Sequence, residues 1–281
     1  MSSNLSAARQ PQPEVSRLLC NDGSRPRVIL AEDSTAARIL TAVLLRRMGC
    51  DVDAVEHGEE ALGLIFSKPY DVIILDIEMP VMDGVTAARN IRDQGGPVGA
   101  TPIVAFSAFL ADTQPGLVRD LFDGILAKPA GRQALRMLLS KVLAEKPDSS
   151  AAPGAPAEPG RGPADTAAGC LAGLRSEFPN NAWRDLLSTA MSEFKQDLSA
   201  AAHAFASGEL EQLRYRCHII KGVARTFAAV ELAEIADAIE NQIIAKKPRD
   251  LAGQLHRLRA CADRTMGNLA ALRGAPEGVG R

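Results

Sequence analysis

The chain has 281 residues, enough for two ordinary domains that each bury a hydrophobic core. Its formal net charge is -2 and it has no block of consecutive Lys or Arg, which argues against a dedicated nucleic-acid-binding protein. No apolar run approaches the roughly 20 residues needed to cross a bilayer, so no membrane insertion is expected. Five scattered cysteines and an N-terminus without an apolar signal segment favour a reduced, cytoplasmic protein.

The first half of the chain predicts one α/β domain. Residues 1–26 lack periodicity and predict a disordered lead-in, whereas residues 27–146 alternate short apolar runs with helical patterns. Strands are expected within 27–33, 51–55, 71–76, 102–107 and 124–127, and helices from a Ser34 cap to Gly49 and at 58–67, 84–94, about 112–122 and 132–144. This alternation predicts a flavodoxin-like, doubly wound, five-stranded parallel sheet.

The second half predicts an all-α domain behind a linker. Residues 147–172 are rich in Pro, Ala and Gly and predict a semi-extended linker, and residues 275–281 predict a flexible tail. Within residues 173–274, helical patterns cover 181–206, 209–227, 229–245 and 249–272. Their connections are short, which makes consecutive helices antiparallel neighbours, so a four-helix bundle is expected.

Chemically complementary residues follow the predicted strands of the first domain. Glu32 and Asp33 end the first strand, Asp76 the third, Ser107 the fourth and Lys128 the fifth. In a parallel α/β sheet, ligands bind beyond the carboxyl ends of the strands. Three carboxylates gathered there repel one another, and a hard divalent cation such as Mg²⁺ relieves that repulsion.

Such a site is suited to phosphoryl transfer. Asp76 can attack phosphorus as a carboxylate nucleophile, while the Lys128 ammonium and the Ser107 hydroxyl stabilise the charge on the phosphoryl oxygens. Each residue alone is an ordinary feature of a strand end, and only the complete set indicates a site. Lys128 is expected to be exposed, so its loss should affect the reaction far more than folding.

These residues resemble the receiver domains of bacterial response regulators. The resemblance is carried by the acidic pair Glu32-Asp33, the stretch DVIILDIEMPVMDG around Asp76, Ser107-Ala108 and Lys128-Pro129. It implies that Asp76 accepts phosphate from a phosphohistidine, and that Glu32, Asp33, Asp76 and the Glu78 backbone carbonyl hold Mg²⁺. Ile125 departs from the family, which usually has an aromatic residue there that swings inward on activation.

His218 is the candidate phosphorylation site of the helical domain. The residues Leu213, Cys217, Ile220, Ala224 and Phe227 form an apolar stripe on the second helix. His218 lies about 160° from Ile220 on that helix and is expected to face solvent, where a neutral imidazole offers a nucleophilic nitrogen.

Three neighbours of His218 support this assignment. Lys221 and Arg225 are expected to supply positive charge for a phosphoryl group, and Gly222 to let a partner approach closely. The run CHIIKGVARTF resembles the HxxKG signature of histidine-phosphotransfer (Hpt) domains, with Val223 and Ala228 as departures. An exposed His beside a Lys is otherwise an ordinary helix face, so the glycine and the preceding domain decide the interpretation.

The sequence therefore predicts a phosphorelay protein without a kinase module, in which slow self-hydrolysis of the aspartyl phosphate is possible. The expected partners are a sensor histidine kinase and a downstream response regulator on separate chains. A runner-up is a Mg²⁺-dependent phosphatase of the haloacid-dehalogenase kind, but there the metal-binding acids follow the nucleophile and the general acid is Asp rather than Glu78. A non-catalytic scaffold leaves both sites unexplained. The linker can reach roughly 25 Å as a coil and about 70 Å when extended, which allows exchange within one chain.

Overall fold

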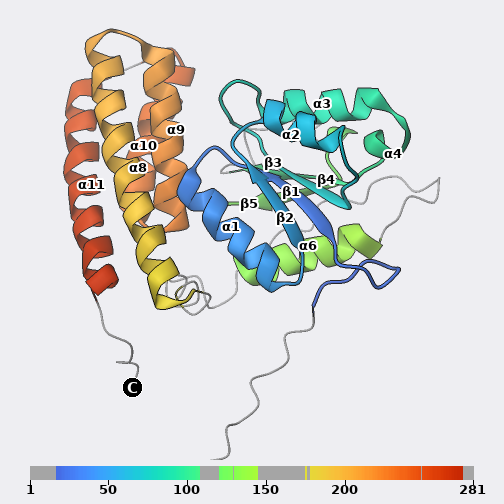
Figure 1. Ribbon diagram of the computed structural model, residues 1–281. Helices are drawn as coiled ribbons and strands as arrows, with labels where there is room; N and C mark the ends of the chain where they lie inside the picture. Colours follow the sequence, from blue (N-terminus) through green and yellow to red (C-terminus); the bar gives the residue numbers. More distant parts are fainter. Residues whose placement is uncertain are drawn as a thin grey trace, which may run out of the picture.

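The computed structural model describes residues 17–107, 120–128, 130–144, 175, 178–247 and 249–274. Within these ranges an α/β domain is followed by four long helices (Figure 1). No helix among the described residues is long and apolar enough to cross a membrane. Most of the predicted helix at 112–122, the predicted linker 147–172 and the predicted tail 275–281 lie outside the described residues.

The first domain is built on a five-stranded parallel sheet in the order β2-β1-β3-β4-β5. The strands are β1 (Arg27–Ala31), β2 (Asp51–Val55), β3 (Val72–Asp76), β4 (Ile103–Ser107) and β5 (Gly124–Ala127). Every residue of β3 and β4 is buried, because helices cover both faces of the central strands. The strand order and the helices confirm the predicted doubly wound sheet.

The helices of this domain lie on both sides of the sheet (Figure 1). They are α1 (Thr35–Arg47), α2 (Gly58–Ile65), α3 (Gly84–Gln94), the short α4 (Gly96–Gly99), which the sequence did not predict, and α6 (Arg132–Ala144). Apolar residues of α1 and α6 share one buried cluster with one face of the sheet, and those of α2 and α3 share another with the opposite face.

Side-chain caps begin three of these helices. Ser34 accepts a hydrogen bond from the Ala37 amide at the start of α1, as predicted, and Asp83 does the same for Thr86 at the start of α3. His57 caps α2 by accepting from the Glu60 amide. These caps fix where the chain turns at the carboxyl ends of β1, β2 and β3, which is the edge that carries the candidate site.

Residues 17–26, which the sequence assigned to the disordered lead-in, pack on the first domain. Leu18 is buried, and its amide donates to the Met48 carbonyl at the end of α1 over 2.8 Å. The short apolar run at Leu18 and Leu19 is too brief to give a periodic signal, so the sequence did not predict this contact.

The second domain is a four-helix bundle, as predicted. Its helices are α8 (Asn180–Ala206), α9 (Leu210–Thr226), α10 (Val230–Ile244) and α11 (Leu251–Gly274). The predicted stripe of α9 is buried: Leu213, Cys217, Ile220 and Ala224 are all fully enclosed. Ala228, where the family commonly has glycine, has φ +56° in the turn after α9, a conformation that favours glycine.

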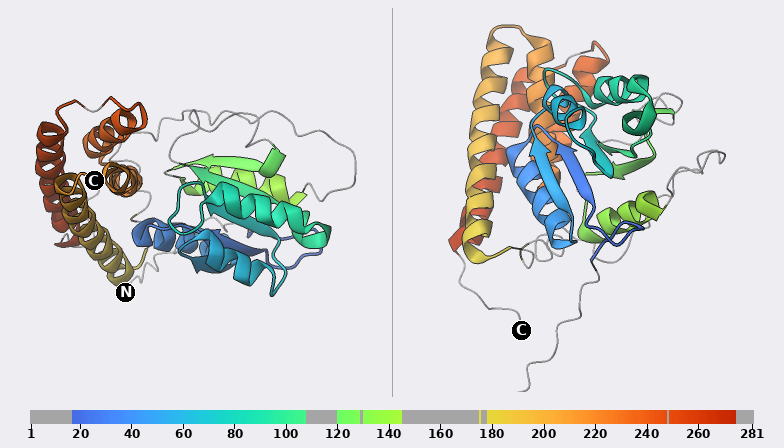
Figure 2. Two further views of the ribbon diagram at one scale, coloured as in Figure 1. Left: turned by 90° about the horizontal axis from the view of Figure 1, so that it is seen from above. Right: turned by 45° about the vertical axis from the view of Figure 1, so that its right-hand side comes forward.

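The two domains lie against each other. Helix α1 sits between the sheet and the bundle, beside α8 (Figures 1 and 2). Buried apolar residues of the sheet face under α1 and of the bundle core belong to one cluster. The bundle therefore presents its α8 and α9 surfaces to the end of the sheet that carries Asp76.

Candidate functional site

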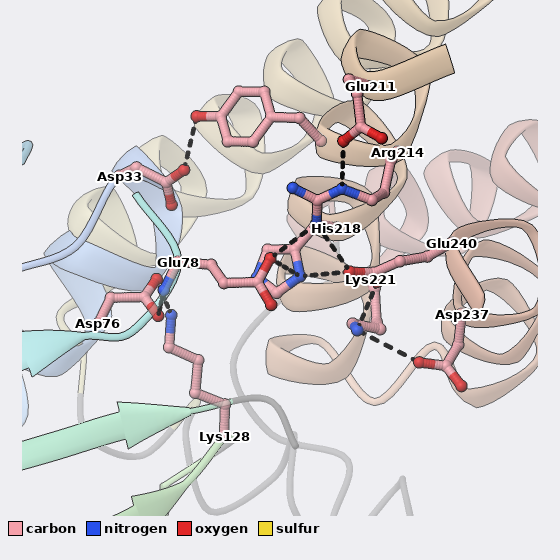
Figure 3. A network of polar contacts seen from close by, with 11 residues as sticks. Asp33, Asp76, Glu78, Lys128, Glu211, Arg214, His218, Lys221, Asp237 and Glu240 are labelled. Carbon is pink, nitrogen blue, oxygen red and sulfur yellow. Dashed lines mark hydrogen bonds and ion pairs between the residues drawn. The ribbon is translucent and has the colours of Figure 1, made fainter. Parts of the chain in front are cut away.

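The strand ends bring the predicted residues together. Asp76 is the last residue of β3 and Ser107 the last of β4, while Glu32 and Asp33 follow β1 and Lys128 follows β5. Carboxylate oxygens of Glu32, Asp33 and Asp76 all lie within 4.8 Å of one another. Figure 3 shows Lys128 reaching the Asp76 carboxylate and Asp33 directed toward the bundle. The predicted residues therefore lie together, and helix α9 of the bundle, which the sequence did not place there, lies beside them.

Lys128 is the cation of this cluster, and it is buried rather than exposed. Its ammonium lies 2.6 Å from Asp76 Oδ2 and 2.5 Å from Glu32 Oε2, and its side chain is 5% exposed. The Phe106 ring lies below it, with 4.9 Å from Nζ to the ring centroid. The expectation of an exposed lysine was wrong because neighbouring chain segments, absent from a strand-end pattern, close over the ammonium.

The electrostatics of the cluster are those of too many carboxylates for one cation. Burial, opposed in part by Lys128 and reinforced by Asp76 and Asp33, raises the pKa of Glu32 to about 8. Burial and the charge of Asp76 also raise the pKa of Asp33. Burial alone would lower the pKa of Lys128, but Asp76 and Glu32 outweigh it and raise that pKa.

The residues present fit a hard divalent cation. Three carboxylates lie around one ammonium, which contacts only Glu32 and Asp76. Oxygen donors with excess negative charge are the ligand set that Mg²⁺ takes. Glu32, Asp33 and Asp76 are therefore the side chains that could hold it, as predicted, and the Glu78 backbone carbonyl remains a predicted ligand.

The loop after β3 is tightly folded around Asp76. A Cβ at Gly84 would collide with the Asp76 carbonyl oxygen, so only glycine fits there. The Glu78 amide reaches Asp76 Oδ1 over 3.3 Å, and the Gly84 amide donates to the Ile77 carbonyl over 3.0 Å. This compact loop turns the Glu78 side chain away from the sheet and toward the bundle.

Ser107 and Ile125 complete the sheet side of the site. Ser107 is buried at the end of β4, and its carbonyl accepts from the Lys128 amide over 2.8 Å, which ties the two predicted catalytic residues together. Ile125 is half-buried and packs with the apolar cluster under α2 and α3. Position 125 thus carries an aliphatic side chain instead of the aromatic residue that swings inward in the receiver family.

His218 is buried between the two domains, contrary to the predicted exposure. Its Nδ1 lies 3.1 Å from Glu240 Oε1 on α10 and 3.1 Å from Glu78 Oε2 in the loop after β3 (Figure 3). The helical wheel placed His218 opposite the apolar stripe of its own helix α9. It could not show that α10 and another domain lie in that direction.

Glu240 is a functional residue that the sequence prediction missed. Its second oxygen accepts from Lys221 Nζ over 2.6 Å, and Lys221 also pairs with Asp237 over 3.2 Å. Burial would raise the pKa of Glu240, yet hydrogen bonding and charge from His218, joined by Lys221, lower it to about 2. An ionised carboxylate beside Nδ1 favours the tautomer that carries its proton on Nδ1, which leaves the lone pair on Nε2. The readable signal was a glutamate on the buried face of α10.

The predicted support residues of His218 differ in their placement. Lys221 is buried inside the bundle and bound to Glu240, so it acts on His218 through that carboxylate rather than from an exposed outer face. A Cβ at Gly222 would meet no described atom within 4 Å, so the loop after β3 does not pack against this glycine. Arg225 is half-buried on α9, and its role stays a prediction.

Side chains of α9 also bind the acidic cluster directly. Tyr215 donates its hydroxyl to Asp33 Oδ2 over 2.8 Å, and Arg214 Nη1 lies 3.3 Å from Glu78 Oε2 and 3.7 Å from Glu240 Oε1. Glu78, His218 and Glu240 form a second cluster of metal-type ligands. Because Arg214 and Lys221 already neutralise its carboxylates, we assign no metal to it.

Two family models match this chain, one for each domain. The response regulator receiver domain matches residues 28–140, and the Hpt domain matches residues 166–269. No kinase domain is matched in this chain. Each match covers the residues that form one of the two clusters described above.

Similar proteins match through part of their length. The chain is 32% identical over 126 residues to the autoinducer 1 sensor kinase/phosphatase LuxN of Vibrio campbellii, which is 45% of this chain and 14% of that protein. It is 34% identical over 119 residues to the sensor histidine kinase GacS of Pseudomonas protegens, covering 41% of this chain and 13% of that protein. The chain therefore spans about one seventh of the length of these curated relatives.

Solved receiver domains are also similar. The receiver domain of a sensor histidine kinase from Pseudomonas aeruginosa, solved with a magnesium ion in its active site cleft, is 27% identical. That match has a TM-score of 0.41 and covers 43% of this chain and 99% of the solved chain.

Removal of the buried ammonium should destabilise the first domain. Lys128→Ala leaves the buried carboxylates of Glu32 and Asp76 without their cation and should lower the free energy of unfolding by about 3 kcal/mol in EDTA, measured by urea denaturation at pH 7.5. Lys141→Ala, which removes an exposed lysine of α6, should change it by less than about 0.5 kcal/mol. Equal unfolding midpoints for the two variants would show that Lys128 stabilises nothing.

Glu240→Gln tests the carboxylate behind His218. The pKa of Glu240 in the folded chain lies below its ordinary value of 4.5, so the stability that its charge contributes is present above about pH 4.5 and is lost as the pH falls toward 2. The variant should be less stable than wild type by about 2–3 kcal/mol at pH 7, and this difference should shrink by pH 3. Denaturant unfolding across this range measures it, with exposed Glu234→Gln on the same helix as the control. A difference that does not depend on pH would contradict the assignment.

Proposed function

Because this chain joins a response regulator receiver domain to an Hpt domain, a pairing typical of phosphorelay in two-component signalling, we propose that it carries phosphoryl groups on Asp76 and His218 and exchanges them between these residues. The observation that carries the proposal is the Glu78 side chain, which leaves the Asp76 loop and contacts both His218 and Arg214. In Figure 3 it extends from the loop after β3 toward His218. A residue of the Asp76 loop thus contacts His218 within one chain, which supports exchange between the two proposed sites.

At the receiver site, Asp76 is the nucleophile. An oxygen of its carboxylate attacks phosphorus of a phosphohistidine, the new O–P bond forms as the N–P bond breaks, and the imidazole leaves with the electron pair. Lys128, 2.6 Å from Asp76 Oδ2, balances the negative charge that gathers on the phosphoryl oxygens, and Ser107 is placed at the neighbouring strand end to donate a hydrogen bond. A bound Mg²⁺ would supply further positive charge to these oxygens.

At the Hpt site, the bundle prepares His218 for the reverse attack. Glu240 holds the proton on Nδ1, so the Nε2 lone pair attacks the aspartyl phosphate and the Asp76 carboxylate leaves. Lys221 positions Glu240, and Arg214 places a guanidinium beside the imidazole. A phosphoryl group arriving there would meet Arg214, which at present pairs with Glu78.

The same geometry argues against the phosphatase alternative. In that mechanism the acidic residue two positions after the nucleophile protonates the leaving group, so its carboxyl must face the reacting phosphate. The Glu78 carboxylate instead pairs with His218 and Arg214 on the other domain. This orientation fits a phosphoryl relay between domains.

The partners follow from the two modules. A receiver domain takes its phosphoryl group from a phosphohistidine, and an Hpt domain passes it to a receiver aspartate. We propose that a sensor histidine kinase and a downstream response regulator, on separate chains, supply and accept it. The sensor kinases similar to this chain are consistent with a place in such a pathway.

Labelling tests the two phosphorylation sites. Acetyl phosphate with Mg²⁺ should give one acid-stable, base-labile phosphoryl group that is absent in Asp76→Asn, and an acid-labile group that is absent in His218→Gln. EDTA should abolish labelling of the wild-type chain. Unchanged labelling of Asp76→Asn would remove Asp76 as the acceptor, and full labelling in EDTA would remove Mg²⁺ from the mechanism.

Mixing tests whether exchange occurs within one chain. The domains are already in contact, so transfer between Asp76 and His218 should have a first-order rate that does not change on dilution. A mixture of Asp76→Asn and His218→Gln chains must transfer between molecules and should be at least about tenfold slower at micromolar concentration. A mixture as fast as the wild-type chain would show that the two sites serve different partners.

A further inference from the structure

Helix α1 begins with backbone amides that its own sequence does not satisfy. The Ser34 side chain accepts only the Ala37 amide, and the first turn of α1 contains no acidic residue. The amides of Thr35 and Ala36 therefore point out of the helix end with the partial positive charge of the helix dipole. They lie two and three residues after Asp33 of the acidic cluster.

A carboxylate of the other domain occupies this helix end. Glu193 Oε1 accepts from the Thr35 amide over 2.6 Å, and its Oε2 accepts from the Ala36 amide over 3.1 Å. The Ser34 hydroxyl reaches Oε2 over 3.4 Å. Besides its N-cap Ser34, α1 thus has a second capping residue on α8, 158 residues after Thr35 along the chain. Bidentate hydrogen bonds to an ionised acceptor are stronger and more directional than neutral ones.

The surrounding residues hold this contact in register with the phosphorylation sites. Asp197 lies one turn after Glu193 on α8 and pairs with Arg216 over 3.0 Å. The Arg216 guanidinium lies 5.4 Å from the ring centroid of Tyr215, whose hydroxyl donates to Asp33. The bundle therefore holds the connection between β1 and α1 at two places. Tyr215 binds Asp33, and Glu193 binds the first turn of α1.

Glu193 takes no part in the proposed chemistry, because within the described residues its hydrogen bonds go to Ser34, Thr35 and Ala36 and not to Asp76, Lys128 or His218. Resting on the proposed relay, we propose that Glu193 is the specificity residue by which this Hpt domain selects its own receiver. Glu193 binds a receiver in which the first turn of α1 contains no acidic residue, and this contact positions His218 beside Glu78. A receiver with Asp or Glu in that first turn would be repelled by the Glu193 carboxylate.

Amide hydrogen exchange in the full chain tests the contact directly. In Glu193→Ala, the Thr35 and Ala36 amides should exchange at least about tenfold faster than in wild type, since their acceptor is gone. Glu234→Gln, the control on exposed α10 surface, should leave both amides protected. The rate of transfer from phosphorylated Asp76 to His218, measured on the same samples, should fall about tenfold in Glu193→Ala only.

A charge swap keeps the test independent of folding. Thr35→Asp places a second carboxylate opposite Glu193 and should slow transfer, and Thr35→Asp combined with Glu193→Lys should restore it. Equal amide exchange in Glu193→Ala and the control, or a swap that restores nothing, would overturn the specificity role. A wild-type chain that protects both amides but never transfers between Asp76 and His218 would contradict the proposed relay and leave the Glu193 contact standing.

Discussion

At the end of the sheet three carboxylates, two of them buried and that of Asp33 half-buried, lie around one buried ammonium, and the other contacts of the site follow from this imbalance of charge. Lys128 pairs with both Glu32 and Asp76, which leaves Asp33 to find its partner elsewhere. Asp33 instead accepts a hydrogen bond from the Tyr215 hydroxyl. Burial and Asp33 raise the pKa of Tyr215, so the phenol stays protonated and can donate this bond. The excess negative charge can therefore be balanced in two ways, by a divalent cation or by hydrogen-bond donors of the bundle such as Tyr215.

Chemistry and domain contact use adjacent residues. Asp33 and Glu78, one position after Glu32 and two after Asp76, reach Tyr215, Arg214 and His218 on α9. In the proposed relay, a change of charge at Asp76 would occur beside the same loops that contact the Hpt domain. The receiver could then influence the Hpt domain although position 125 holds isoleucine rather than an aromatic residue.

How much the sequence predicted depends on the range of the contacts. Strand ends, helix bounds and the acidic cluster were predictable, because apolar runs that stop at Glu32, Asp76 and Lys128 are local patterns. The burial of Lys128 and His218 was not, since the groups that cover them come from distant segments. Glu240 carried a readable signal, an acid on the apolar face of α10, whereas Glu193 carried none, because its partners are backbone amides.

The apolar cluster that runs from the sheet face under α1 into the bundle sets the terms on which other proteins meet this chain. Separating the domains exposes part of that cluster to water and leaves the Thr35 and Ala36 amides without their acceptor. In the proposed relay, an external receiver would bind only the fraction of molecules in which the domains have parted, so its apparent affinity would be reduced by that fraction. The chain's own receiver would then compete with any external receiver for the surface around His218.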